Sequence, residues 1–386
     1  MDTIFGPSPA PKTALGRHRV LSPSCGMKVS PLQLGAMSLG QAWTSFMGTM
    51  SKEESFKLLD AYVDAGGSMI DTANNYQNDE SETWIGEWMK ERGNRDRVVI
   101  ATKYTTNYRT YALGKNEAIQ YGGNNRRSMH LSVRDSLKKL QTEWIDILYM
   151  HWLSHDASIK EVMDALHILV EQGKVLYLGV SDTPAWWVAA ANQYAIDHGK
   201  TPFVIYQGRW NVMLRDLERD IIPMCRQFGM AIAPWDAIGS GKLCTQKQLD
   251  ERKAKGEKFR GGADDRTELE IKYSEVLAKI AKEHGIESVT AVALAYLMAK
   301  TPYVFPIVGG RKVEHLHDNI QSLEIKLTAE QIAEIDGTQE FEFGFPHNFC
   351  GTDPSLIPTE GRPQNILIKA SGTLDFLPGP KPFGLA

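Results

Sequence analysis

The sequence predicts an α/β fold, a (β/α)8 TIM barrel with an N-terminal hairpin, long active-site loops and a C-terminal extension. Short apolar runs alternate with helical patterns along most of the 386 residues, an order typical of a parallel sheet. Eight such runs occur, and polar residues stand at the carboxyl ends of consecutive runs, where barrels carry their sites. An open dinucleotide-binding sheet would need a glycine-rich first turn, but residues 35–40 read G-A-M-S-L-G.

The predicted strands begin after a short N-terminal arm. Two short runs on either side of Pro23–Gly26 predict a hairpin over Val20–Ser30, ahead of the first barrel strand. The runs that we interpret as the eight barrel strands are Leu32–Leu34, Met69–Ala73, Val98–Lys103, Ile145–His151, Leu176–Ser181, Phe203–Gln207, Met230–Trp235 and Val304–Val308.

Start and stop signals predict the helices between these strands. Ser51 and Glu54 have the spacing of a capping box before the helix Ser55–Ala65, and Gly66–Gly67 ends that helix. A second helix opens at Asp79–Glu82 in a similar way. Further helices are predicted at Ser128–Leu140, Ser158–Glu171, Pro184–His198, Leu217–Phe228, Glu268–His284, Val289–Ala299, Val313–Ser322 and Thr328–Asp336.

Three long connections remain outside this pattern: Tyr104–Arg127, Asp236–Thr267 and the tail Phe341–Ala386. Connections of this length in a domain are usually functional, and the first two follow the carboxyl end of a predicted strand. The charge run Asp250–Lys258 is interpreted as a solvated part of the second connection. We divide the chain into an N-terminal arm and hairpin (1–28), a barrel (29–340) and a C-terminal extension over the barrel mouth (341–386).

The charge balance and the cysteines argue against several classes of function. Lys and Arg total 43 against 47 Asp and Glu, and the formal charge of -4 offers no basic surface for nucleic acid or an anionic membrane. No stretch has membrane-spanning length, no apolar signal region opens the chain, and no N-x-[ST] sequon occurs. The cysteines form no C-x-x-C pair, which favours a reducing, cytoplasmic setting. They are Cys25, Cys225, Cys244 and Cys350.

Four polar residues at three adjacent strand ends are expected to meet at one mouth of the barrel: Asp71, Tyr76, Lys103 and His151. A phenol with a reference pKa of about 10 donates a proton poorly near neutrality, but the ammonium of Lys103 would lower that pKa. Asp71 would hold the lysine, and His151 would polarise a substrate oxygen. Each residue alone could be a rim ion pair, a packing phenol or a core histidine. Together they make a carbonyl-reducing site that lacks only a hydride source.

Several motifs carry a family resemblance by their order and spacing. They are I-D-T-A-N-N-Y at 70–76, A-T-K at 101–103, Y-M-H-W at 149–152, G-K-V at 173–175 and L-G-V-S at 178–181. With them, the chain resembles the aldo-keto reductases over about Val29–Asp336. Within that superfamily it resembles fungal aryl-alcohol dehydrogenases and norsolorinic acid reductases, through segments 76–82, 88–89, 140–146, 206–212 and 308–312. The resemblance implies Tyr76 as proton donor, with Asp71, Lys103 and His151 completing a tetrad.

The same resemblance implies NADP(H) as cofactor. The nicotinamide would lie in the mouth with its ring on an aromatic residue, the pyrophosphate along a Gly-Ser-Gly turn with accessible backbone N–H groups, and the adenosine beside the last strand. The residues implied in these contacts are Asp71, Ser181, Asp182, Gln207, Trp235, Asp236, Gly239, Ser240, Gly241, Lys242, Gly309, Gly310, Arg311, Lys312, His315 and Asn319. Arg311 and Lys312 favour a 2′-phosphate, hence NADP over NAD, unless they are a solvated basic pair.

Three positions depart from the family pattern. Asp182 stands where many relatives have Asn, and His315 stands where a number of them have Arg or Gln. The seventh strand ends in W-D-A-I-G at 235–239 rather than Y-S-P-L-G. Two other motifs are set aside. Y-x-x-x-K at 111–115 lies in a predicted loop, and the H-x-x-x-H at 151–155 starts at a strand end rather than on a helix, so we expect no metal.

We expect an NADP-dependent oxidoreductase that passes a hydride to an aldehyde or ketone, aromatic by the resemblance, while Tyr76 protonates the oxygen. The substrate pocket is expected to involve His151, Trp43, Trp152 and Trp210. The partner is then a small carbonyl or alcohol. Two alternatives stay open: a tailoring reductase of a fungal polyketide or terpenoid pathway, and a cofactor-binding regulatory subunit with little turnover.

Overall fold

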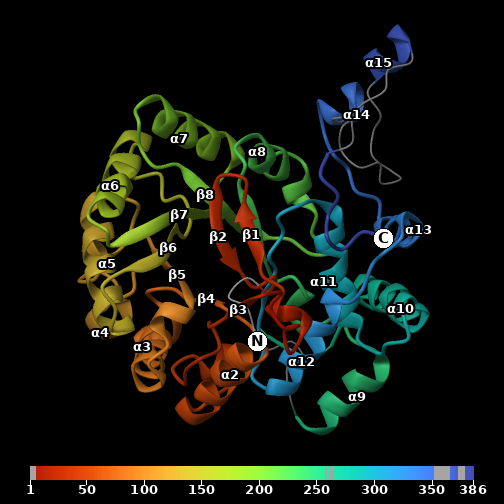
Figure 1. Ribbon diagram of the computed structural model, residues 1–386, viewed down its shortest axis with the longest axis horizontal. Coiled ribbons are helices and arrows are strands. Elements are labelled where there is room, and N and C mark those ends of the chain that lie inside the picture. Colours follow the sequence, from red (N-terminus) through yellow and green to blue (C-terminus); the bar gives the residue numbers. More distant parts are fainter. Residues whose placement is uncertain (1–5, 257–258, 261–264, 352–365, 373–378) are drawn as a thin grey trace.

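The computed structural model describes residues 6–256, 259–260, 265–351, 366–372 and 379–386. Its centre is a ring of parallel strands surrounded by helices, the predicted (β/α)8 barrel (Figure 1). Neighbouring strands follow the order β10-β3-β4-β5-β6-β7-β8-β9, and a parallel bridge between Ile232 and Val304 joins its two ends. Among the described residues, the barrel strands are β3 (Gln33–Gly35), β4 (Met69–Asp71), β5 (Val99–Tyr104), β6 (Ile145–Met150), β7 (Val175–Ser181), β8 (Phe203–Arg209), β9 (Ala231–Trp235) and β10 (Ile307–Val308).

The predicted N-terminal hairpin is present and closes one end of the barrel. Strands β1 (Arg19–Ser22) and β2 (Cys25–Val29) pair antiparallel. Leu21 of the hairpin is fully buried in the cluster that fills the barrel, together with Met69, the first residue of β4. Burial of each such side chain stabilises the fold by roughly 1.5–3 kcal/mol. Since the hairpin covers the amino ends of the strands, the other end of the barrel is free to form the mouth.

The helices around the barrel follow the predicted order. Their packing against the strands buries a second, larger apolar layer between the sheet and the helices. The α-helices are α1 (Thr44–Met47), α2 (Lys52–Asp64), α3 (Glu80–Arg92), α4 (Thr110–Leu113), α5 (Arg126–Leu140), α6 (Ile159–Glu171), α7 (Ala185–Asp197), α8 (Ile221–Gln227), α9 (Gln246–Ala254), α10 (Glu268–Glu283), α11 (Val289–Lys300), α12 (Val313–Ile320), α13 (Ala329–Asp336), α14 (His347–Cys350) and α15 (Ile366–Ser371). The 3-10 helices that bear on the site are η2 (Tyr76–Asp79), η4 (Ile119–Tyr121), η5 (Asp216–Glu218) and η6 (Gly239–Gly241).

Two details of the predicted elements are wrong. The charge run after residue 250 begins inside helix α9, which starts with a capping box between Thr245 and Gln248. The last strand is shorter than predicted, because Pro306 has no N–H to donate to a neighbouring strand and β10 begins only at Ile307.

The end of the C-terminal extension does not cover the mouth. Phe341, at its start, packs against the guanidinium groups of Arg215 and Arg219. In Figure 1, α14 and α15 project outward, away from the barrel. Leu385 then pairs with Leu327, and Phe383 lies under Arg19 of the hairpin. Residues 383–386 therefore pack near the closed end. Residues 352–365 and 373–378 of the extension lie outside the described residues, so an extension over the mouth stays a prediction.

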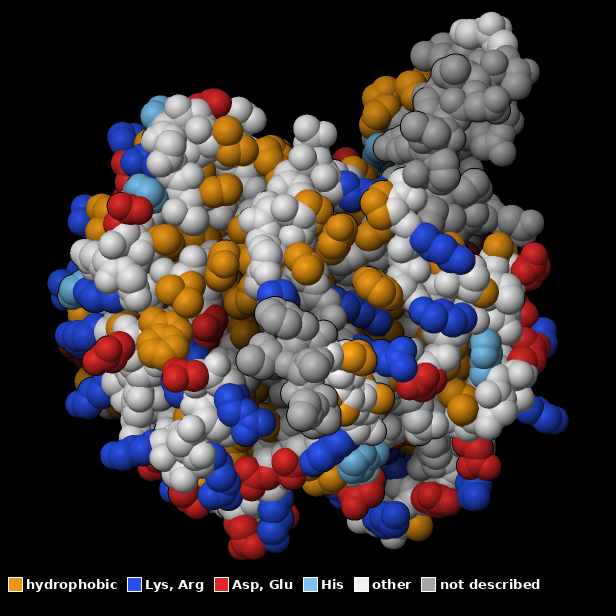
Figure 2. All heavy atoms as spheres, in the orientation of Figure 1, with side chains coloured by type: hydrophobic (Ala, Val, Ile, Leu, Met, Phe, Trp, Pro, Cys, Tyr) orange, Lys and Arg blue, Asp and Glu red, His pale blue; other side chains and the backbone are white. Residues whose placement is uncertain are grey.

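The surface seen in Figure 2 carries Lys, Arg, Asp and Glu side chains interspersed around its periphery, with apolar side chains nearer the centre. No helix within the described residues is both long enough and apolar enough to span a membrane.

Candidate active site

The carboxyl ends of β4, β5 and β6 bring the four predicted tetrad residues together. Asp71 ends β4, Lys103 lies near the end of β5, and His151 follows β6 directly. Tyr76 opens η2, in the turn that follows β4. All four side chains are buried, with 9% or less of each residue exposed. The structure therefore brings these four residues together at the mouth of the barrel.

The ammonium of Lys103 is the centre of this group. Its nitrogen donates to Asp71 Oδ1 over 2.6 Å, to the backbone oxygen of Thr72 over 2.7 Å and to the Tyr76 hydroxyl over 3.4 Å. These contacts use all three N–H donors of the ammonium. The other carboxylate oxygen of Asp71 accepts the side-chain N–H of Gln207 over 2.8 Å. The buried charges are thus paired and hydrogen-bonded, as their burial requires.

The pKa of Tyr76 differs from the sequence expectation. Burial raises this pKa above its usual value of 10, and the opposing effect of the Lys103 charge is smaller. Lys103 does lower the pKa of Tyr76, as expected, but burial outweighs this effect and the net shift is upward. Burial lowers the pKa of Lys103, but the combined effect of Asp71 and Tyr76 in the opposite direction is larger, so the pKa of Lys103 is raised overall. At neutral pH the phenol thus keeps its proton beside a charged ammonium.

His151 is held as a neutral imidazole. Burial, and secondarily the charge of Lys103, hold the pKa of His151 well below its usual 6.5. Its Nδ1 lies 3.1 Å from the hydroxyl of Thr106, and its ring stacks on Trp152 with centroids 4.1 Å apart. A Thr106 hydroxyl that donates to Nδ1 leaves the ring proton on Nε2. In that tautomer, Nε2 can donate a hydrogen bond to a substrate oxygen.

Aromatic rings flank the tetrad on two sides. The Trp43 ring meets Tyr76 edge-to-face at 6.1 Å, and Tyr76 meets His151 in the same manner at 6.0 Å. Trp152 is 40% exposed beside His151. Trp210, in contrast, is fully buried in the core, and its indole N–H donates to Glu218. The structure therefore brings Trp43 and Trp152 to the tetrad and leaves Trp210 behind the wall of the barrel.

The ends of β7, β8 and β9 place the residues expected to hold a nicotinamide. The Ser181 hydroxyl is buried and has no hydrogen-bond partner among the described residues. Asp182 is a left-handed residue (φ 41°), and its carboxylate accepts the indole N–H of Trp235 over 3.0 Å. Desolvation of the carboxyl group at the mouth raises the pKa of Asp182 to about 6 despite that hydrogen bond, although part of the residue stays open to solvent. The unpaired Ser181 hydroxyl could form a hydrogen bond with the carboxamide of a nicotinamide, next in sequence to the residue that holds the Trp235 indole.

The turn after β9 lets a ligand come close to its backbone. Gly239, Ser240 and Gly241 are consecutive left-handed residues, with φ of 58°, 57° and 82°. The φ of Gly241 favours glycine, and the Arg252 guanidinium lies nearby. The expected accessible N–H groups are largely engaged, because those of Gly239, Gly241 and Lys242 donate to backbone oxygens within the turn. A pyrophosphate would therefore be accommodated here mainly because the glycines have no side chains.

Two residues that were expected to contact the pyrophosphate, Asp236 and Lys242, bind other side chains of this protein instead. The Asp236 carboxylate accepts hydrogen bonds from Arg209 and Ser240, and its side chain is only 2% exposed. The ammonium of Lys242 donates to Glu270 over 2.8 Å. Asp236 thus shapes the turn from within.

The residues expected at the adenosine end follow β10. Arg311, Lys312 and His315 are exposed, whereas Asn319 is buried. The Arg311 guanidinium lies directly against Gly48, in the loop that also carries Trp43. The backbone oxygen of Gly310 accepts the hydroxyl of Ser38 over 3.3 Å. Gly309 precedes Gly310 in this turn, so the predicted set is contiguous on the surface beside the mouth.

Three contributors escaped sequence reasoning. Thr106 contacts His151, Arg252 approaches the Gly-Ser-Gly turn, and Arg260 donates to the Met37 sulfur over 2.9 Å. The charge of Arg260 also reaches Tyr76, where it slightly opposes the upward shift of the pKa. Arg252 and Arg260 lie in the second long connection, and that location at the mouth was the available signal. Within the described residues, no cluster of three or more His, Cys, Asp or Glu could hold a metal.

Comparisons with known proteins agree with this geometry. Residues 31–340 match the model of the aldo/keto reductase family. An aldo-keto reductase of Aspergillus calidoustus is 57% identical over 353 residues, 91% of this chain and 89% of that protein. An aryl-alcohol dehydrogenase [NADP(+)] of Phanerodontia chrysosporium is 53% identical over 384 residues, 97% of both chains. Norsolorinic acid reductase B of Dothistroma septosporum is 48% identical over 370 residues, 94% of this chain and 93% of that protein.

Proposed function

Because this chain belongs to the aldo/keto reductase family, we propose that it is an NADP(H)-dependent reductase of aromatic aldehydes or ketones. The observation that carries the proposal is the buried group at the mouth, in which the Tyr76 hydroxyl lies 3.4 Å from the Lys103 ammonium and beside His151. A protonated phenol, a fixed cation and a neutral imidazole together can polarise and protonate a carbonyl oxygen.

The residues of the chain would divide the reaction as follows. Bound NADPH would supply the hydride that adds to the carbonyl carbon. Nε2 of His151 would donate a hydrogen bond to the carbonyl oxygen, and Tyr76 would transfer its proton to that oxygen as charge develops there. Lys103 would stabilise the resulting phenolate, which then regains a proton from solvent. The product is the alcohol.

The cofactor assignment is supported by the fit of three features. They are the unpaired Ser181 hydroxyl, the Trp235 ring and the left-handed turn at Gly239–Gly241. The preference for NADP is supported by the exposed Arg311 and Lys312, since a guanidinium matches a 2′-phosphate in geometry and charge. The name of the Phanerodontia relative, an aryl-alcohol dehydrogenase [NADP(+)], agrees with that preference.

The aromatic substrate class is supported by the rings of Trp43 and Trp152 on either side of the tetrad. A polycyclic aromatic ketone is a second candidate substrate, favoured by the name of the Dothistroma relative. A cytoplasmic setting belongs to the same proposal, because NADPH is available there and all four cysteines are unpaired.

The test is NADPH consumption with veratraldehyde and with a polycyclic aromatic ketone, for the wild type and Tyr76→Phe. Turnover that collapses by about a hundredfold or more in Tyr76→Phe, with NADPH fluorescence still quenched on binding, is the expected result. Quenching without turnover on either carbonyl would favour a regulatory role, and no binding of NADPH or NADH would refute the assignment. Arg311→Ala should weaken NADPH binding by about tenfold or more while leaving NADH binding nearly unchanged.

A further inference from the structure

We propose that Asp79 is a positioning residue for Tyr76, and that Tyr111 couples the connection between β5 and α5 to it. The inference rests on the proposed function, because it concerns the phenol assigned as proton donor. Tyr76 is followed by three left-handed residues, Gln77, Asn78 and Asp79, with φ of 53°, 52° and 79°. Non-glycine residues seldom adopt this conformation, and a run of three persists only where side-chain contacts hold it.

The first two of these residues are held by the loop that carries Trp43. The Gln77 side chain donates to the backbone oxygen of Met37 over 2.9 Å and accepts the backbone N–H of Trp43 over 2.8 Å. Asn78 accepts the Trp43 indole N–H over 3.1 Å. One wall of the substrate pocket is therefore tied to the backbone that follows Tyr76.

The third residue is held by the barrel framework. The ammonium of Lys139, on α5, donates to Asp79 Oδ1 over 2.6 Å and to the backbone oxygen of Asn74 over 2.9 Å. It also pairs with the buried carboxylate of Glu82 over 2.7 Å. The three donors of one ammonium thus fix the chain two residues before Tyr76 and three residues after it. Without an acceptor oxygen at position 79, Lys139 would hold only the chain before Tyr76 and the carboxylate of Glu82.

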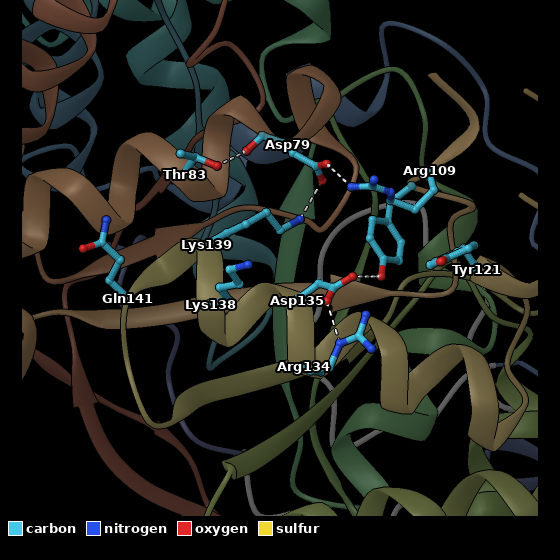
Figure 3. Close-up of a pocket in the computed structure, with 10 residues that line it drawn as sticks. Asp79, Thr83, Arg109, Tyr121, Arg134, Asp135, Lys138, Lys139 and Gln141 are labelled. Atoms are coloured by element: carbon cyan, nitrogen blue, oxygen red, sulfur yellow. Dashed lines mark hydrogen bonds and ion pairs between the residues drawn. The ribbon is translucent and has the colours of Figure 1, made fainter. Parts of the chain in front are cut away.

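The second oxygen of Asp79 faces the connection between β5 and α5. Tyr111 donates its hydroxyl to Asp79 Oδ2 over 2.6 Å, and Arg109 lies 3.7 Å from the same oxygen. Figure 3 shows Asp79 between Lys139 and Arg109. Tyr111 is 50% exposed, so its hydrogen bond is not imposed by burial in a core. The pair instead docks an exposed segment onto the support of Tyr76.

The same connection also reaches the other side of the carbonyl site. Thr106, near its start, contacts His151. A cavity of about 530 Å³ lies beside Asp79 and Lys139, and Arg109, Tyr121 and Lys138 are among the residues that line it (Figure 3). Tyr108 anchors the middle of the segment, because it is buried and donates its hydroxyl to Asp135 on α5 over 2.6 Å, whereas Tyr111 is held at the surface by Asp79. Docking of Tyr111 on Asp79 would then set the positions of Tyr76 and His151 together.

The experiment compares Asp79→Ala, Asp79→Asn and Tyr111→Phe, with Tyr121→Phe as a matched control from the same connection. Turnover of veratraldehyde is measured with NADPH and with NADPH deuterated at C4, and hydrogen exchange is measured by mass spectrometry for the segment around Tyr76. Asp79→Ala should lower kcat by about tenfold to a hundredfold, with the NADPH dissociation constant changed by less than about twofold. The deuterium isotope effect should rise, because the chemical step becomes slower relative to binding and release.

Hydrogen exchange reports positioning independently of turnover. Residues 75–79 should exchange at least about tenfold faster in Asp79→Ala than in the wild type, and Asp79→Asn should recover part of the protection through its remaining acceptor oxygen. Tyr111→Phe should lower kcat by about threefold, and Tyr121→Phe should change nothing.

Two outcomes would overturn parts of the proposal, and a third would count against the proposed function alone. If hydrogen exchange, kcat and the isotope effect of Asp79→Ala all equalled those of the wild type, Asp79 would not position Tyr76. Equal effects of Tyr111→Phe and Tyr121→Phe would remove the coupling through Tyr111, and this comparison stands even if Asp79→Ala fails to fold. A wild-type chain without turnover would tell against the proposed function, while hydrogen exchange would still decide whether Asp79 fixes the segment.

Discussion

The ammonium of Lys103 donates to the carboxylate of Asp71 over 2.6 Å, and their side chains are 0% and 4% exposed. A buried pair of this kind contributes little net stability compared with apolar residues of the same volume. Loss of one partner is costly, however, because the other charge is left without compensation. The pair is therefore explained by its contact with Tyr76 rather than by the needs of the fold.

Replacing Lys103 by Met should damage stability and activity together. The free energy of unfolding, measured in urea, should fall by about 3–5 kcal/mol, because Asp71 then keeps only the hydrogen bond from Gln207. Turnover should fall by about a hundredfold to ten-thousandfold, because the phenolate of Tyr76 loses its counter-charge. The matched control is the double variant Asp71→Asn, Lys103→Met, which should regain part of the stability and none of the turnover. A single variant as stable as the wild type would contradict this account.

His151 should remain neutral across about pH 6 to 8, because burial and Lys103 hold its pKa well below 6.5. The unfolded chain binds a proton at this residue below about pH 6.5 and the folded chain does not, so this residue lowers stability as the pH falls through that range. Nitrogen-15 NMR of the histidine side chains measures this directly. The His151 signal is identified by its loss in His151→Gln, and a titration midpoint near 6.5 for that signal would show the prediction to be wrong.

Asp182 should make the free energy of unfolding decrease as the pH rises from about 4 to about 6. Its pKa is raised to about 6 in the folded chain, so over this range the folded state binds more protons than the unfolded state. Stability then decreases as the pH rises, and the effect is muted because the residue is open to solvent. Asp182→Asn removes this titrating group. The melting temperature of the variant relative to that of the wild type should therefore increase as the pH rises across this range. A constant difference between the two proteins would contradict the prediction.

Ser181→Ala should have opposite effects on stability and on cofactor binding. Removing a buried hydroxyl without a partner should raise the free energy of unfolding of the cofactor-free protein, by up to about 1 kcal/mol. NADPH affinity should fall by about tenfold, because a hydrogen bond to the cofactor is lost. Thermal melts with and without NADPH measure both effects. If Ser181→Ala raised the melting temperature equally with and without NADPH, Ser181 would not contact the cofactor.

The tetrad could be predicted from sequence because strand order dictates it. Residues at the carboxyl ends of adjacent parallel strands must lie close together, so Asp71, Lys103 and His151 follow from the strand assignments alone. The pKa of Tyr76 could not be predicted in the same way. Its direction depends on how completely the phenol is buried, and burial outweighs the neighbouring charge that the sequence does reveal.

The long connections were the least predictable parts. Their side chains contact groups far away in sequence, as Tyr111 contacts Asp79 and Arg260 contacts Met37. Trp210 illustrates the same difficulty, because a tryptophan after a strand end can face the mouth or the core, and here Glu218 and the core hold it. No periodicity or cap distinguishes these outcomes.

The C-terminal extension contacts the barrel near both of its ends. Phe341 packs on Arg215 and Arg219 at its start, and Gly384 and Leu385 pack against the barrel at its end. Gly384 lies against the backbone of α11, where any side chain would collide, and Leu385 pairs with Leu327. Removing residues 384–386 would therefore uncover the backbone of α11 that Gly384 now covers and would break the pairing with Leu327.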